Sequence, residues 1–208
     1  HALASEGINV VLVAIEASEL EATFEELRAA YPRRDFRKVT CDLSSSDGVD
    51  MVYVEAATSD INVALIFFAA NYQVTGFFHA IPLNVHLAGL QANSASAVRM
   101  AHHFLHKLYS SKSVGLLVFL SSPSAELPSP FAALSSATLA FNARLAASLA
   151  AEAGPQGIDV LAAHPSLDTR PEDVPQQLLR RIGRSQIIAD LGPGAVLGRL
   201  LGKVLDAN

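Results

Sequence analysis

Three histidines on one predicted helix have spacing that resembles half of a metal site. His102 and His106 are four residues apart, with His103 between them, so His102 and His106 share a helix face as the two histidines of a zinc pair do. No Asp, Glu or Cys lies nearby in the sequence to complete the ligand set. We therefore predict no metal site and interpret these histidines as a solvated helix surface.

The composition excludes several other classes of function. The hydrophobic fraction is 50% and the charged fraction is 17%, so a buried sheet between helices is expected, with apolar surface left for a partner. The net charge is −5 and the basic residues are scattered, which argues against nucleic-acid binding. Cys41 is the single cysteine and excludes an intrachain disulfide. No apolar run approaches the length of a membrane-spanning helix.

Apolar runs alternate with helical patterns along the chain. The predicted strands are residues 8–14, 36–43, 61–70, 115–120 and 158–165. The predicted helices are residues 18–31, 47–57, 86–108, 130–153 and 171–184, followed by an amphipathic helix from Ala195 to Leu205. This alternation predicts an α/β fold, a doubly wound parallel sheet with helices on both faces. We expect one domain over residues 1–208, in which residues 171–208 form a C-terminal helical extension.

The segment from Leu120 to Phe141, LSSPSAELPSPFAALSSATLAF, resembles the catalytic segment of short-chain dehydrogenases/reductases. The resemblance is strongest to the branch that reduces very-long-chain 3-oxoacyl-CoA and 17-keto steroids, which runs Ser-Ser, Leu-Pro-x-Pro, Tyr-Ser-Ala-Thr-Lys-Ala-Phe. Ser122 falls on the catalytic serine of that pattern, and Asn93 on its catalytic asparagine. Ser135 replaces the tyrosine and Leu139 replaces the lysine. The resemblance covers residues 2–170 and implies a Rossmann-like fold.

These two replacements remove the acid of the family reaction. Reduction of a carbonyl by hydride needs a proton donor beside the developing alkoxide, and the resemblance assigns that role to the tyrosine, its pKa lowered by the lysine. Ser135 is shorter and a far weaker acid, and Leu139 carries no charge. We expect no catalytic residue, and treat Asn93, Ser122, Ser135 and Leu139 as vestigial positions.

The positions that the resemblance assigns to the cofactor near the first strands are altered too. Ile15 stands where NADP-using relatives place an arginine for the 2′-phosphate. Glu16 follows and is either a ribose ligand, as in NAD users, or a solvated residue. Asp42 matches an aspartate near the adenine, and is equally well explained as a turn residue after a strand.

Two further cofactor segments depart from the family pattern. Phe67, Phe68 and Ala70 replace most of an Asn-Asn-x-Gly segment, where we expect the two phenyl rings to fill space that a nucleotide needs. Pro165 and Ser166 replace a Pro-Gly pair, and Thr169 is retained. We therefore expect no cofactor, with NADP or NAD as the alternative. His164, just before Pro165, could replace the proton donor only through an unusual geometry.

The resemblance also implies a first strand and a glycine-rich loop upstream of His1, neither of which is in the given residues. We expect further residues before His1, or another segment in that place, since the strand lies centrally in the family sheet.

Three functions remain open. The first is a catalytically inactive structural or accessory subunit of a larger complex. Its partner would be a protein bound through the helix from His86 to Leu108, the helix from Pro130 to Ala153, or the C-terminal helix. The second is an NADP(H)-dependent 3-oxoacyl-CoA or steroid ketoreductase, and the third a module that holds a nucleotide or acyl chain as a fixed ligand. Analogy suggests a mitochondrial membrane complex, with the endoplasmic reticulum as the alternative.

Overall fold

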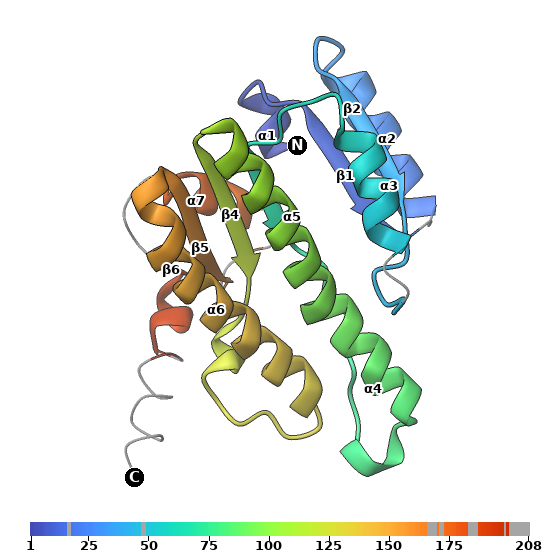
Figure 1. The fold of residues 1–208 in the computed structure, drawn as a ribbon. Helices are drawn as coiled ribbons and strands as arrows, with labels where there is room; N and C mark the ends of the chain where they lie inside the picture. Colours follow the sequence, from blue (N-terminus) through green and yellow to red (C-terminus); the bar gives the residue numbers. More distant parts are fainter. Residues whose placement is uncertain are drawn as a thin grey trace. The chain divides into compact units, whose positions relative to one another are not determined.

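The computed structural model describes residues 1–15, 18–46, 49–165, 170, 173–182, 187–197 and 199. The chain divides into two compact units, His1–Asn62 and Val63–Asn208, where the sequence predicts one domain. Each unit has its own parallel sheet, and no strand in the described ranges joins the two sheets (Figure 1). We call them the N-terminal unit and the C-terminal unit.

The N-terminal unit is built on two paired strands. The strands β1 (Val10–Ala14) and β2 (Phe36–Thr40) are parallel, with Val10 opposite Phe36. Both strands are shorter than their apolar runs predict. The helices of this unit are α1 (Ala2–Ser5), α2 (Ser18–Ala30) and α3 (Val49–Thr58). An ion pair joins Arg37 of β2 to Asp60 just after α3, with two hydrogen bonds of 2.6 and 2.8 Å.

The C-terminal unit contains a four-stranded parallel sheet in the order β3-β4-β5-β6. Its strands are β3 (Leu65–Phe68), β4 (Gly115–Leu120), β5 (Ile158–Pro165) and β6 (Ile188–Leu191). The predicted bounds of β4 and β5 are confirmed, while β3 is shorter than the predicted 61–70. Gly115 starts β4 where the chain passes close to α5, since a Cβ at this position would lie 2.6 Å from Leu108 Cδ1.

One long helical segment follows β3 and another follows β4. The first comprises α4 (Leu83–Leu90), the π-helical turn η2 (Gln91–Ala95) and α5 (Ser96–Ser111), and so begins before the predicted His86. The second is α6 (Ala133–Ala153), which begins three residues after the predicted Pro130. A further helix is α7 (Val174–Leu179), and the 3-10 turns among the described residues are η1 (Phe78–Ala80), η3 (Pro123–Ala125) and η4 (Gly154–Gln156).

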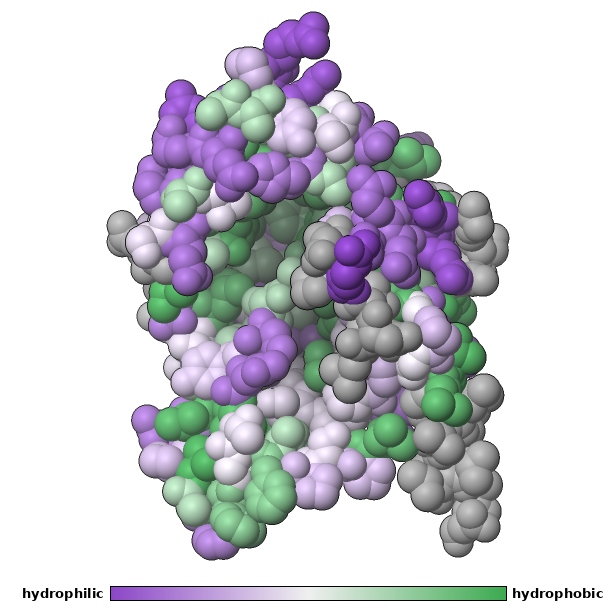
Figure 2. Space-filling view, turned by 180° about the vertical axis from the view of Figure 1, so that it is seen from behind, coloured by the Kyte–Doolittle hydropathy of each residue, from purple (hydrophilic) through white to green (hydrophobic). Residues whose placement is uncertain are grey.

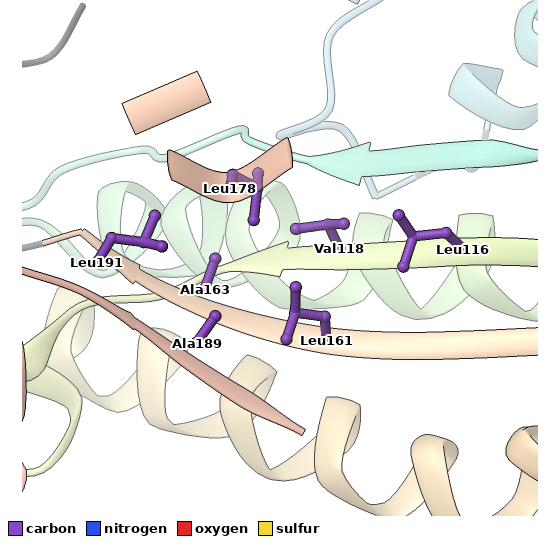
Figure 3. Close-up of a cluster of buried hydrophobic side chains, with 7 residues drawn as sticks. All are labelled: Leu116, Val118, Leu161, Ala163, Leu178, Ala189 and Leu191. Carbon is purple, nitrogen blue, oxygen red and sulfur yellow. The ribbon is translucent and has the colours of Figure 1, made fainter. Parts of the chain in front are cut away.

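Helices cover both faces of this sheet. On one face, Leu178 of α7 packs on a buried apolar cluster that the strands supply (Figure 3). The other members of the cluster are Leu116, Val118, Leu161, Ala163, Ala189 and Leu191. The helix α6 packs on β4 and β5 from the opposite face. The predicted α/β fold with parallel strands and helices on both faces is therefore confirmed.

The prediction that residues 171–208 are helical is wrong at β6. Ala189 and Leu191 are fully buried, and their strand pairs in parallel with β5. A strand of four residues that contains Asp190 is too short to show a clear alternation of apolar and polar residues, so the sequence does not predict it. Burial against β5 stabilises this strand rather than its own β-propensity. Residues 193–197 are helical, whereas most of the predicted helix from Ala195 to Leu205 lies outside the described residues. Over the described ranges, no helix combines the length and hydropathy needed to span a bilayer.

Candidate functional site

Asn93 holds the chain segment that follows β3. Its Oδ1 accepts a hydrogen bond from the backbone N–H of Tyr72 at 2.6 Å, and its Nδ2 donates to the carbonyl oxygen of Tyr72 at 3.0 Å. Nδ2 also donates to Oγ1 of Thr138 on α6 at 3.1 Å. Asn93 is 4% exposed and lies in the π-helical turn η2, a local widening of the helix that is frequent at functional sites. The side chain therefore gives Tyr72 the two backbone hydrogen bonds that a neighbouring strand would give.

Ser135 makes the same kind of contact two residues further along that segment. Its Oγ accepts a hydrogen bond from the backbone N–H of Val74 at 3.1 Å and donates to the carbonyl oxygen of Val74 at 3.4 Å. Thr138, one turn later on α6, donates to the carbonyl oxygen of Ser135 at 3.0 Å and also accepts from Asn93. Asn93 and Ser135 thus belong to one network that binds Tyr72 and Val74 to the helices.

The helices and this segment pack closely at Gly89 of α4. A Cβ at Gly89 would lie 3.0 Å from Leu134 Cδ2, 3.2 Å from Val74 Cγ2 and 3.4 Å from Tyr72 Cδ1. The first two distances are shorter than ordinary van der Waals contacts, so the absence of a side chain lets α4, α6 and the segment approach. Val74 is 5% exposed as a result. The hydrogen bonds between Ser135 and Val74 therefore lie where α4, α6 and the segment after β3 pack closely.

Ser122 and Leu139, the other two positions matched to the family's catalytic residues, make different contacts. Ser122 begins the turn η3, where its Oγ accepts hydrogen bonds from the backbone N–H of Ser124 at 3.2 Å and from the Ser124 hydroxyl at 3.0 Å. Leu139 is partly buried on α6, and its carbonyl oxygen accepts a hydrogen bond from the Ser121 hydroxyl at 3.0 Å. Asn93 and Ser135 are therefore connected through Thr138 in one hydrogen-bond network. The hydrogen bonds that Ser122 makes with Ser124 do not belong to this network.

Ile15 and Asp42 lie at the ends of the two strands of the N-terminal unit. Ile15 directly follows β1 and is 60% exposed. Oδ1 of Asp42 accepts hydrogen bonds from the backbone N–H of Ser44 at 2.9 Å and from the Ser44 hydroxyl at 2.7 Å. This is the geometry of an Asx turn, which agrees with the interpretation of Asp42 as a turn residue. Glu16 lies outside the described residues.

Phe67 and Phe68 are both inside β3. Phe68 is 8% exposed and stacks on Phe119 of β4, with ring centroids 4.3 Å apart. Phe67 packs against the cluster of Figure 3 on the opposite face of the sheet. The two rings therefore do not fill one common space, contrary to our expectation, because successive side chains of a strand point to opposite faces. Ala70 is exposed beyond the end of the strand.

The end of β5 carries a buried histidine that lies beside a buried aspartate, and the sequence did not reveal the aspartate. His164 is fully buried and stands opposite Asp190 of β6, with 3.7 Å between Nδ1 and Oδ1. Oδ2 of Asp190 accepts hydrogen bonds from Arg199 at 2.6 and 2.9 Å. Burial lowers the pKa of His164, and the charge of Asp190 opposes this shift. Among the described residues, neither ring nitrogen has a hydrogen-bond partner.

His164 is fully buried, so its imidazole is not placed to take the role of the family's tyrosine. Pro165 follows as the last residue of β5, whereas Ser166 and Thr169 lie outside the described residues. No sequence signal pointed to Asp190, because its strand was not predicted.

The histidines of the predicted helix lie on α5, with His102 and His106 exposed. Within the described ranges, no three His, Cys, Asp or Glu side chains gather in a way that could hold a metal ion.

Comparison with known proteins identifies a family and individual proteins to which this chain is similar. The family model described as short chain dehydrogenase matches residues 1–170. The 7beta-hydroxysteroid dehydrogenase of Mediterraneibacter gnavus is 27% identical over 76% of this chain and 59% of its own length. The very-long-chain 3-oxoacyl-CoA reductase of Podospora anserina is 24% identical over 99% of this chain and 59% of its own length. This chain thus spans about three-fifths of the length of these relatives.

Among solved structures, a short-chain dehydrogenase from Sphingobium yanoikuyae in complex with NADPH has the same fold. It superimposes with a TM-score of 0.82 at 22% identity, over 99% of this chain and 85% of that protein.

Proposed function

Since this chain belongs to the short-chain dehydrogenase family, we propose that it is a catalytically inactive member that serves as a structural or accessory subunit of a larger protein assembly. The observation that carries this proposal is the engagement of Ser135. Its hydroxyl exchanges hydrogen bonds with both backbone groups of Val74, so it is not free to donate a proton to an alkoxide. Leu139, four residues later on α6, brings no charge that would make such a donor more acidic.

The residues present do not fit the nicotinamide dinucleotide that the family implies. Ile15 offers an exposed apolar side chain where a phosphate or a ribose would need a polar one. The carboxylate of Asp42 already accepts two hydrogen bonds from Ser44. Leu139 has no ammonium group to hold a ribose. We therefore propose that the protein acts without this cofactor.

The assembly partner would contact the long helices α4–α5 and α6, or the segment after β6. Large apolar side chains are exposed on each of them, at Val98 and Tyr109 of α5, Phe141 of α6, and Leu197. Such side chains become stabilising when a partner removes them from water. By analogy with oxidoreductase folds that serve as accessory subunits, we propose a mitochondrial membrane complex as the setting.

An active NADP(H)-dependent ketoreductase is the second candidate. The names of the curated relatives favour it, since they are a hydroxysteroid dehydrogenase and an oxoacyl-CoA reductase. In that case another group of this chain must supply the proton.

An activity assay distinguishes the two candidates. We expect the natural protein that carries this chain to oxidise no NADPH above background with a 3-oxoacyl-CoA or a steroid ketone, and calorimetry to detect no binding of NADPH or NADH at micromolar concentration. The double variant Ser135→Tyr, Leu139→Lys should also show no reductase activity. The larger tyrosine side chain cannot keep the hydrogen bonds that the Ser135 hydroxyl makes with the backbone of Val74. Turnover that disappears in a Ser122→Ala variant would refute inactivity.

Native gel electrophoresis of a gentle extract tests the assembly. We expect a species well above the mass of a monomer or dimer, with other proteins in it. Migration only as a free monomer or a homodimer would refute the role of a subunit, whatever the activity assay gives.

A further inference from the structure

A histidine, an aspartate and an arginine from three successive elements meet at the carboxyl ends of β5 and β6. His164 stands opposite Asp190 in the register of the two strands, and both side chains are buried. The same carboxylate binds Arg199, whose Nε and Nη2 donate hydrogen bonds to Oδ2 at 2.9 and 2.6 Å. Arg199 belongs to the helical residues 193–197 and 199, which we call the post-β6 helix. One aspartate therefore connects a buried imidazole to the helix that follows the sheet.

The contact between the histidine and the aspartate is incomplete. Nδ1 of His164 lies 3.7 Å from Oδ1 of Asp190, which is too far for a hydrogen bond. Among the described residues, neither ring nitrogen of His164 has a hydrogen-bond partner, and Oδ1 of Asp190 has none either. Buried polar atoms without partners cost free energy. A proton added to His164 changes this balance, because an imidazolium donates from both nitrogens and the free oxygen of Asp190 faces it.

Opposing electrostatic effects act on this proton. Asp190 of β6 and Glu126, directly after η3, favour the charged imidazole, whereas Arg199 disfavours it. The charged side chains of α6 are exposed, and β4 and α7 carry none. Burial outweighs the two carboxylates, so the pKa of His164 is lowered. The folded arrangement therefore keeps His164 neutral, although the carboxylates beside it would hold a proton if water could reach the ring.

The post-β6 helix is built so that the ion pair matters for its attachment. It follows a turn at Gly192, whose φ of +118° is open to glycine and strained for other residues. Ala195 is fully buried but contributes only a methyl group, and Leu197 is 58% exposed. Figure 2 shows hydrophobic residues on the surface at the right-hand side, where the chain leaves β6. The bond from Arg199 to Asp190 is therefore a main attachment of this helix to the sheet.

We propose that His164, Asp190 and Arg199 form an acid-sensitive latch, which holds the post-β6 helix on the sheet while His164 is neutral and releases it when His164 takes up a proton. Opening lets water reach the imidazole and removes the cost of burying its charge. Asp190 then pairs with the imidazolium, and Arg199 loses its partner. The closed latch is fully stable above about pH 6.5, the pKa of a hydrated histidine, and loses stability as the pH falls below it. This latch goes beyond the proposed function and does not depend on it.

Amide hydrogen exchange in the natural protein that carries this chain tests the latch. Between pH 7.5 and pH 5.5 the Leu197 amide should lose about tenfold in protection, after correction for the intrinsic pH dependence of exchange, because a hydrated histidine becomes mostly protonated over this range. The loss should be insensitive to low concentrations of urea, since a local opening exposes little surface, whereas the Leu117 amide in the core of β4 should respond to urea. His164→Gln cannot titrate and should show equal protection of Leu197 at both pH values. His102→Gln, at an exposed position of α5, is the control and should keep the tenfold loss.

Arg199→Gln gives a second reading at a partly exposed position, where a substitution does not disturb the core. This variant lacks the charged partner of Asp190, so its Leu197 amide should exchange at pH 7.5 about as fast as that of the wild type does at pH 5.5. Equal protection of Leu197 at both pH values in the wild type would overturn the proposal, as would a tenfold loss that persists in His164→Gln. A Leu197 amide that exchanges at the same rate and with the same urea dependence as Leu117 would overturn it too, because the helix would then open only when the whole unit unfolds.

Discussion

Replacing Ser135 with alanine removes the hydroxyl that bonds to both backbone groups of Val74. The bond from the Val74 N–H is 3.1 Å long and leaves a buried donor unpaired when it is lost, which costs about 1.5 kcal/mol. The second bond, at 3.4 Å, is long and contributes little. Alanine regains up to about 0.5 kcal/mol of helix propensity. The net expectation is a loss of about 1 kcal/mol, concentrated in the segment around Val74.

Amide hydrogen exchange resolves this loss at single residues. We expect the Val74 amide to exchange roughly five- to tenfold faster in Ser135→Ala, because each 1.4 kcal/mol is a factor of ten. Ser136→Ala is the matched control, since that hydroxyl donates within the helix to the Ala133 carbonyl oxygen. It should leave Val74 unchanged. Equal exchange at Val74 in both variants would show that Ser135 does not hold this segment, and would remove the main support for its structural role.

Three further results are expected. Asn93→Ala should lower the free energy of unfolding by about 2–3 kcal/mol in urea titrations, because three hydrogen bonds are lost, whereas Asn84→Ala on the exposed face of α4 should cost nothing. Lowering the pH from about 7.5 to about 5.5 should destabilise the C-terminal unit, because burial lowers the pKa of His164, so the unfolded chain takes up a proton before the folded one does. His164→Gln should flatten that dependence, and an equal slope in both proteins would contradict the assignment. The hydrogen-bonded ion pair with Arg37 lowers the pKa of Asp60 to about 2. The stability that this ion pair contributes is therefore present above the unfolded pKa of about 3.9 and is lost as the pH falls towards 2. An NMR titration of the Asp60 carboxyl group checks this pKa.

The central strands could be predicted from local sequence, and so could the residue types at the positions of the family's tyrosine and lysine. The strand β4 is an unbroken apolar run that opens with Gly115, and β5 is an apolar run, interrupted only at Asp159 and His164, that follows Gly157. Burial on both faces favours such runs. Ser135 and Leu139 are four residues apart, so any helix that contains both presents them on one side. The absence of a phenol and an ammonium group there follows from residue identity alone.

Tertiary contacts decided what those side chains do instead. The Ser135 hydroxyl meets Val74, which is 61 residues away in the sequence, and no local pattern predicts such a partner. Phe68 stacks on Phe119 because of the pairing register of β3 with β4, whereas the sequence alone placed its ring in a ligand space. The strand β6 forms because burial against β5 outweighs its weak intrinsic preference, and only that pairing brings Asp190 to His164. Residue type determined which functional groups stand at the positions of the family's tyrosine and lysine, because functional groups belong to single residues. The fold determined which contacts these side chains make, because contacts need two distant segments to meet.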